Sequence, residues 1–257
     1  MPRLTEHEHL DAVANWAARI RDQLAHLLER RNGEVHFRPS SGGIAMVGLL
    51  HDRPQRGKRS ITNLARLAAD FDAEFALHCV DCDQGRPTPE KQLQSFLIAD
   101  AYRHDRRMAV LEAASASTVS PVLLEFITDE LVIPTNNGKV VCDLLALRTA
   151  DHATIPVVVE LKSARDKARL VVQVEGYADF VDAHADGYAQ IYSALLGRPV
   201  EFAAPCERWI VWPSAGPGPD RHEAELGTRG IRVVTYEQHG PSFTFCVGVP
   251  ARGGVAR

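Results

Sequence analysis

The chain has 257 residues, of which 45% are hydrophobic and 24% are charged, so it can bury a core, and its length fits one large domain or two small ones. Its 29 basic and 33 acidic residues give a net charge of −4, which argues against a surface that binds polyanions throughout and leaves only local basic patches for nucleic acid. No stretch approaches the roughly 18 apolar residues of a membrane helix, and the first residues are too polar for a secretory signal. We therefore expect a soluble, cytoplasmic protein with no membrane partner.

The first elements of the chain are expected to form a small α+β region. Residues 4–31 carry apolar side chains at helical spacing and end at Asn32-Gly33, a typical helix C-terminus. The elements that follow are strand-like segments at 34–38 and 43–50, a basic loop at 52–59 and a helix opened by Ser60.

The five cysteines, an odd number in a long chain, are typical of reduced thiols and not of a disulfide framework. Cys79 and Cys82 have the spacing of a zinc-binding pair, and His78 lies beside them. A structural zinc site needs about four ligands, so buried thiols are the alternative interpretation of this pair.

A domain boundary is predicted where glycine and two prolines gather within 82–89. We therefore divide the chain into an N-terminal region at 1–82, a main domain at 83–250 and a flexible tail at 251–257. The N-terminal region would supply specificity or a surface for a partner.

The main domain is expected to be an α/β fold built on a mixed sheet. Thr88 and Pro89 begin a helix that runs to residue 111, with threonine as cap and proline at the first helical position. The later elements are strands at 123–128, 139–148 and 155–163, helices at 164–184 and 187–196, a strand at 208–212, a short helix at 221–228, a strand at 231–236 and an edge strand at 242–249. Strands that come first as a group and then alternate with helices indicate a mixed sheet with helices packed on it.

Two charged residues share one face of the strand that reads VVVELK. Because side chains alternate along a strand, Glu160 and Lys162 lie on the same side as Val158. An edge strand with one wet face would give the same pattern, so this pair needs a second feature before it indicates a site.

Asp143 is that second feature, because it lies in an otherwise apolar segment where an unpaired buried carboxylate is costly. If the two apolar segments form a hairpin with its loop at 149–154, the symmetric register pairs Arg148 with Ile155. Asp143 then lies opposite Glu160. Directly opposed carboxylates repel each other, so this register predicts a cation between them.

Lys162 can neutralise part of that negative charge, but a hard divalent ion fits better, since Mg²⁺ is often bound by one or two carboxylates and a substrate phosphate. A third feature lies on the following helix, where Gln173 and Tyr177 are four residues apart and share a face. A hydrogen-bonded polar pair in the core is the alternative interpretation of these two residues.

The order of these residues resembles the PD-(D/E)XK nuclease superfamily. Asp143 is followed after 16 residues by Glu160-Leu161-Lys162, and then by Gln173 and Tyr177. The pattern is similar to the QxxxY-containing branch of RecB-like and NucS-like nucleases, and the resemblance covers roughly residues 88–237. It implies a restriction-endonuclease-like core and hydrolysis of phosphodiester bonds in DNA, in repair or in restriction of foreign DNA.

The resemblance also implies a role for each site residue. Asp143, Glu160 and the Leu161 carbonyl would hold Mg²⁺ or Mn²⁺, and Lys162 would orient or deprotonate the attacking water. Glu90 on the preceding helix would complete the metal shell, with Glu112 and Glu125 as alternatives. The residues that would contact the DNA backbone are Gln173, Tyr177, Lys167 and Arg169.

A site that contacts only phosphates is also compatible with RNA as the substrate. A homodimer could cut both strands of a duplex. The competing interpretation is a catalytically inactive module that binds nucleic acid or protein on a nuclease-like scaffold. The negative net charge and the ambiguous upstream acid favour that alternative, while a zinc-dependent protein built on Cys79 and Cys82 is a third.

Overall fold

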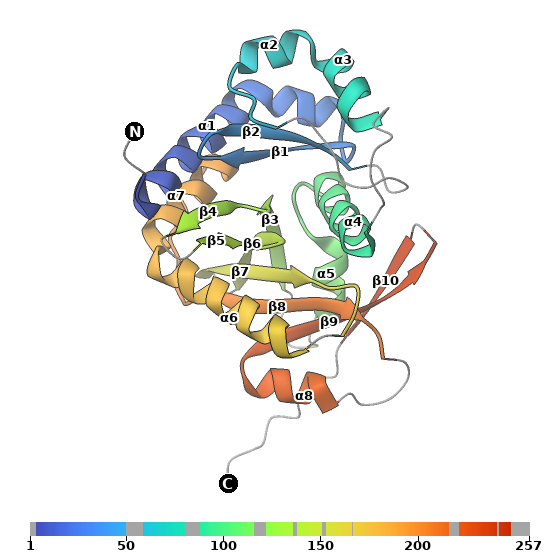
Figure 1. Ribbon diagram of the computed structural model, residues 1–257. Helices are drawn as coiled ribbons and strands as arrows, with labels where there is room; N and C mark the ends of the chain where they lie inside the picture. Colours follow the sequence, from blue (N-terminus) through green and yellow to red (C-terminus); the bar gives the residue numbers. More distant parts are fainter. Residues whose placement is uncertain are drawn as a thin grey trace.

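A six-stranded mixed sheet forms the centre of the fold, with the strand order β10-β9-β8-β7-β6-β3 (Figure 1). Its strands are β3 (Leu123–Asp129), β6 (Leu144–Ala150), β7 (Ala153–Leu161), β8 (Glu207–Pro213), β9 (Ile231–His239) and β10 (Ser242–Val247). Neighbouring strands from β3 to β7 are antiparallel, β7, β8 and β9 are parallel, and β10 returns antiparallel along the edge. The computed structural model describes residues 4–49, 59–80, 88–115, 122–135, 138–150, 153–165, 167–215, 221–240 and 242–247.

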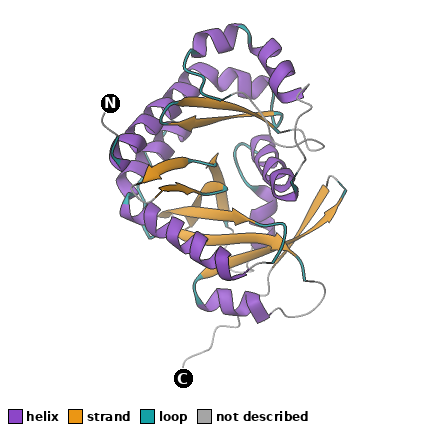
Figure 2. Cartoon of the chain, in the orientation of Figure 1, coloured by secondary structure: helices purple, strands orange, loops and turns teal. Residues whose placement is uncertain are grey.

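Helices cover both faces of this sheet (Figure 2). The helices are α6 (Lys167–Ala183), α7 (Ala185–Leu196) and α8 (Arg221–Thr228) on one face, and α4 (Pro89–Arg103) and α5 (Ala109–Ser115) on the other. The alternation along β7 explains the division, since Val158 packs under α6 and α7 while Val157 and Val159 pack under α4 and α5. The predicted mixed sheet flanked by helices is therefore confirmed.

The N-terminal region forms a further layer against this domain. Its elements are α1 (Glu6–Arg30), the antiparallel hairpin of β1 (Val35–Ser40) and β2 (Gly43–Gly48), the helices α2 (Leu64–Ala69) and α3 (Phe71–Phe75), and the π-helical turn η1 (Ala76–Val80). Helix α1 joins the two layers, because Leu10 and Val13 pack in the core beside α7, whereas Leu24 packs beneath the β1–β2 hairpin. The predicted boundary at residues 82 and 83 lies outside the described residues.

Several predicted elements are confirmed with small shifts in their ends, among them α1, α6, α7, α8 and the edge strand β10. Helix α2 begins later than predicted. Ser60 has a left-handed backbone, with φ of 56°, and Ile61 forms a bridge with Ile44, so the helix starts only when Asn63 caps it.

The helix predicted to run from Thr88 to residue 111 is in fact two helices. Helix α4 ends at Arg103, and both Asp105 and Arg106 have positive φ angles. The Arg106 guanidinium donates to the carbonyls of Phe126 and Ile127 on β3, at 3.0 and 2.6 Å. A continuous helix would point this side chain elsewhere, so the tertiary contact accompanies the break.

The strand predicted at 139–148 is also divided, and this division positions the site. Its first part is β5 (Gly138–Val141), which pairs with β4 (Val132–Thr135), a strand that sequence reasoning missed. Its second part is β6, which pairs with β3 and β7. The chain changes partners at Cys142 and Asp143, so Asp143 lies at a bend between two small ladders. Among the described helices, none is long and apolar enough to span a membrane.

Candidate metal and phosphodiester site

The predicted hairpin register is confirmed at the centre of the site. Strands β6 and β7 pair Arg148 with Ile155, and the same register continues to Leu144 opposite Val159. One further step along both strands places Asp143 opposite Glu160. Glu160 lies on the face of the sheet that carries Val158 and packs beneath α6.

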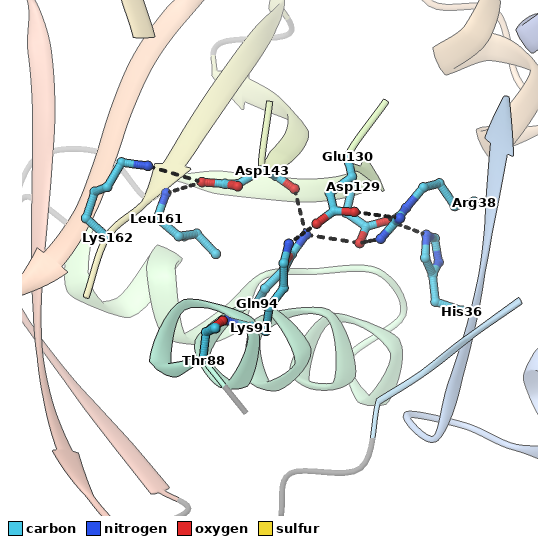
Figure 3. A network of polar contacts seen from close by, with 10 residues as sticks. All are labelled: His36, Arg38, Thr88, Lys91, Gln94, Asp129, Glu130, Asp143, Leu161 and Lys162. Carbon is cyan, nitrogen blue, oxygen red and sulfur yellow. Dashed lines mark hydrogen bonds and ion pairs between the residues drawn. The ribbon is translucent and has the colours of Figure 1, made fainter. Parts of the chain in front are cut away.

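Lys162 and the β7 backbone connect these two carboxylates. The Lys162 Nζ atom lies 3.3 Å from Glu160 Oε2 and 3.9 Å from Asp143 Oδ2. The Leu161 amide donates a 2.8 Å hydrogen bond to Asp143 Oδ2 (Figure 3). The Glu160 side chain is 0% exposed, whereas those of Asp143 and Lys162 are 25% and 21% exposed. Glu160 is therefore closed to solvent, whereas Asp143 and Lys162 are partly accessible.

The electrostatics of this pair are unfavourable for two negative charges. Burial, and then the charge of Asp143, raise the pKa of Glu160 to about 8, and Lys162 offsets only part of this rise. Glu160 Oε1 is buried and has no hydrogen-bond partner among the described residues. A buried carboxylate oxygen that lacks a donor and faces a second carboxylate is the environment in which a cation binds favourably.

These residues fit a divalent cation with oxygen ligands. Asp143 and Glu160 offer carboxylates, and the Leu161 amide donates to Asp143, whereas no described contact places the predicted Leu161 carbonyl ligand at the site. Within the described ranges, no three His, Cys, Asp or Glu side chains lie close enough together to hold a metal ion. Mg²⁺ commonly takes only one or two carboxylates and completes its shell with water and substrate phosphate, so two carboxylates suffice for such a site.

The predicted upstream acids make contacts of their own. Glu90 Oε1 accepts hydrogen bonds from Ser163 N and Oγ, at 3.2 and 3.4 Å, just after the end of β7. Among the described residues, no hydrogen bond or ion pair joins Glu90 to either carboxylate of the site. The two alternative upstream acids form ion pairs with other residues, Glu112 with Arg107 and Glu125 with Arg198.

The two polar residues of α6 differ in their exposure to solvent. Tyr177 is buried, and its hydroxyl lies 3.5 Å from the Leu131 carbonyl and 3.4 Å from the Tyr188 hydroxyl. Burial raises the pKa of Tyr177 well above its ordinary value. Gln173 is exposed. Among the described residues, no hydrogen bond joins Gln173 or Tyr177 to Asp143 or Glu160, so their predicted role at the site stays a prediction.

The structure describes the remaining predicted site residues only in part. Lys167 and Arg169 lie in the first turn of α6, and their side chains are outside the described residues. Cys79 is buried in the core of the N-terminal region, while Cys82 falls outside the described residues, so the proposed zinc pair has no described geometry.

Sequence reasoning missed a buried polar network beside the site. Its members come from β1, α4, the end of β3 and the turn that follows it, and they are His36, Arg38, Lys91, Gln94, Asp129 and Glu130. Asp129 is wholly buried in an apolar segment, so the reasoning that singled out Asp143 could also have found it. Its partner Arg38 lies 91 residues upstream, and no local pattern indicates that pairing.

Negative charge exceeds positive charge across the site and this network. The acidic side chains are Glu90, Asp129, Glu130, Asp143 and Glu160, and the cationic ones are Arg38, Lys91 and Lys162. Burial lowers the pKa of His36, which favours its neutral form. Because the pKa of Glu160 is raised to about 8, the excess among these groups is one negative charge while Glu160 keeps its proton, and it becomes two when a cation displaces that proton.

Comparisons of the chain with protein-family models, with curated proteins and with solved structures found no match. Function is therefore inferred from the geometry and charge of the site, since a fold by itself does not specify an activity.

Proposed function

We propose that this protein is a metal-dependent nuclease that hydrolyses phosphodiester bonds in DNA, with a restriction-endonuclease-like core of the PD-(D/E)XK type. The observation that carries the proposal is the convergence of Asp143 and Glu160 from adjoining strands beside Lys162, with one buried Glu160 oxygen left without a donor. The register of β6 and β7 supports it, because the ladder ends with Leu144 opposite Val159, one residue from each carboxylate.

Bound Mg²⁺ or Mn²⁺ would lower the pKa of a water molecule and stabilise negative charge on the phosphoryl oxygens. Asp143, Glu160 and the Leu161 carbonyl would hold the ion. The Asp143 carboxylate is held in place by the Leu161 amide, so its free oxygen keeps a defined direction. Lys162 is partly exposed beside both carboxylates, and its ammonium would donate a hydrogen bond to the water or to the scissile phosphate.

The substrate would be gripped through its phosphates and not through its bases, since phosphate contacts position nucleic acid without reading sequence. Gln173, which is exposed on α6, would contact the backbone beyond the scissile bond. Tyr177 would support the turn at Leu131 and not the substrate. Repair and restriction of foreign DNA both use such an activity, and RNA or a homodimer would fit the same chemistry.

The direct experiment is to incubate the purified protein with circular and linear DNA in Mg²⁺ or Mn²⁺. Wild type should cut and EDTA should stop it. Asp143→Ala and Lys162→Ala should each reduce the rate by at least about a hundredfold, because each removes a group that would act in the transition state. Wild type without activity, or variants as active as wild type, would refute the proposal.

A second candidate is a catalytically inactive binding module on the same scaffold. Two observations favour it: no third acidic side chain joins Asp143 and Glu160 within the described ranges, and Tyr177 is buried. Calorimetry with Mn²⁺ separates the candidates. The nuclease should bind Mn²⁺ in a manner that Glu160→Gln abolishes, whereas an inactive module should show no heat that depends on Glu160.

A further inference from the structure

The backbone of Asp143 is held from outside its own hairpin. Residues 142 and 143 lie between β5 and β6. At this bend the Asp143 carbonyl accepts hydrogen bonds from Gln94 Nε2 at 3.1 Å and from the Glu130 amide at 3.2 Å. With the Leu161 amide on the side chain, Asp143 is fixed on two sides, and one of them depends on α4 and the β3–β4 turn.

Gln94 is the link between that bend and the buried network. Its side chain is buried, its Nε2 atom also donates to Asp129 Oδ2 at 3.0 Å, and its Oε1 atom accepts from Lys91 Nζ at 2.7 Å. Asp129 Oδ2 and the Asp143 carbonyl can only accept hydrogen bonds, so the Gln94 amide must turn its NH₂ group toward both of them. The orientation of Gln94 is therefore set by Asp129 and Lys91.

Asp129 in turn depends on the N-terminal hairpin. Its carboxylate receives the Arg38 guanidinium, with Nε 2.7 Å from Oδ1 and a second contact to Oδ2, and His36 Nε2 lies 3.0 Å away. Burial by itself would raise its pKa, but Arg38 and His36 hold the pKa of Asp129 well below its ordinary value. Arg38 also pairs with Glu130 at 2.7 Å.

Glu130 adds a second route from the hairpin to the bend. Its φ of 40° places it in the left-handed region, where a residue other than glycine is uncommon, and in this conformation its amide meets the Asp143 carbonyl. Its carboxylate contacts Arg38 and Lys91. Figure 3 shows these side chains in a row from His36 and Arg38 on β1 to Asp143 and Lys162.

We propose that Arg38 and Gln94 are positioning residues for Asp143, so that the N-terminal hairpin is an integral part of the metal site. This inference rests on the proposed function, because it assigns the network to the same carboxylate. Hydrogen bonds that orient a metal ligand commonly change metal affinity by about 10- to 100-fold when they are removed. Loss of either residue should therefore weaken metal binding and turnover without removing any group that touches DNA.

The first test is independent of metal and of DNA. Hydrogen exchange of the Leu161 amide, followed by NMR in EDTA, reports whether Asp143 Oδ2 stays in place. Gln94→Met keeps the size of the side chain but removes its donors, and Arg38→Lys keeps the charge but removes the two-point contact. Both variants should speed exchange at Leu161 by about tenfold or more relative to amides in the middle of β8, which report global opening.

Arg148→Lys is the matched control. Arg148 also gives two nitrogens to one carboxylate, that of Glu207, at 3.0 and 2.7 Å, and it is similarly part-buried, but it lies at the other end of the β6–β7 hairpin. Exchange at Leu161 should be unchanged in this variant. Unchanged exchange in Gln94→Met, or equal acceleration in Arg148→Lys, would overturn the inference. Gln94→Met decides the question if Arg38→Lys fails to fold.

The second test measures Mn²⁺ affinity by calorimetry and steady-state cleavage of circular DNA. Gln94→Met should bind Mn²⁺ about tenfold or more weakly and lower kcat while KM for DNA stays near that of wild type. If wild type cuts DNA and Gln94→Met matches it in every measurement, the inference fails and the proposed function stands. If wild type neither binds Mn²⁺ nor cuts DNA, the proposed function fails, and exchange at Leu161 still decides whether the network holds Asp143.

Discussion

Replacing Glu160 with glutamine should make the metal-free protein more stable, which is unusual for a buried residue in the middle of a sheet. The Glu160 side chain is fully buried, and its Oε1 atom has no donor among the described residues. Burial and the charge of Asp143 raise its pKa from an ordinary 4.5 to about 8. Glutamine carries no charge, and its amide can donate to Asp143.

The sign and size of the effect follow from proton linkage. Because the folded-state pKa of Glu160 is raised, the folded chain keeps a proton that the unfolded chain has released, so stability falls as pH rises between 4.5 and 8. At about 1.4 kcal/mol for each pH unit, wild type loses about 3 kcal/mol by pH 7 and about 5 kcal/mol by pH 9. Burial of the glutamine amide offsets part of this gain, which leaves a net stabilisation on the order of 2 kcal/mol at pH 7.

The assay is urea unfolding in EDTA at pH 5 and pH 8, repeated with Mn²⁺. Glu160→Gln should equal wild type near pH 5 and exceed it at pH 8. Mn²⁺ at a hundred times its Kd should stabilise wild type by about 2.7 kcal/mol and should leave the variant unchanged.

A second buried glutamate serves as the contrast. Glu112 accepts hydrogen bonds from Arg107 and from the Leu124 amide, so Glu112→Gln should destabilise the protein by about 2 kcal/mol at both pH values. Our assignment of Glu160 would be refuted if Glu160→Gln were less stable than wild type in EDTA at pH 8, or if Mn²⁺ stabilised both proteins equally.

Four further predictions follow from the contacts and the exposure of these residues. Asp129→Asn should lower the free energy of unfolding by about 3–5 kcal/mol at pH 7, because it removes the fully buried carboxylate that pairs with Arg38 and leaves that guanidinium with Glu130 as its anionic partner among the described residues. In wild type, the stabilisation from Asp129 should be present above its ordinary pKa of 3.8 and should be lost as pH falls below that value, as acid unfolding will show. Mn²⁺ affinity measured by calorimetry should rise by up to about tenfold per pH unit between pH 6 and 8, since binding must displace the proton of Glu160. Tyr177→Phe should leave kcat within about twofold and reduce the free energy of unfolding by less than about 1 kcal/mol, because its hydroxyl makes only long contacts in the core. Gln173→Ala, by contrast, should weaken DNA binding in a filter or gel-shift assay.

Local patterns predicted the part of the site that belongs to one hairpin. Alternation along a strand placed Glu160 and Lys162 on one face, and the symmetric register placed Asp143 opposite Glu160; the structure confirms that register. Both inferences depend only on the period of a strand and on the position of a turn, which are properties of neighbouring residues.

Contacts between distant segments decided the rest. The bend at Asp143 exists because β5 pairs with β4 while β6 pairs with β3, and the break after Arg103 accompanies the capture of β3 carbonyls by Arg106. Helical spacing places Gln173 and Tyr177 on one side of α6, but it does not predict that Tyr177 is buried against Tyr188 of α7 while Gln173 stays exposed.

The amino-acid sequence by itself therefore determined which residues carry charge on the hairpin and how its two strands align, because these depend on short-range geometry. Only the tertiary structure decided that Arg38 pairs with Asp129 and that Gln94 donates to the Asp143 carbonyl. Their contacts join residues that are 91 and 49 positions apart, and such pairings are specified by the packing of whole layers and not by any local period.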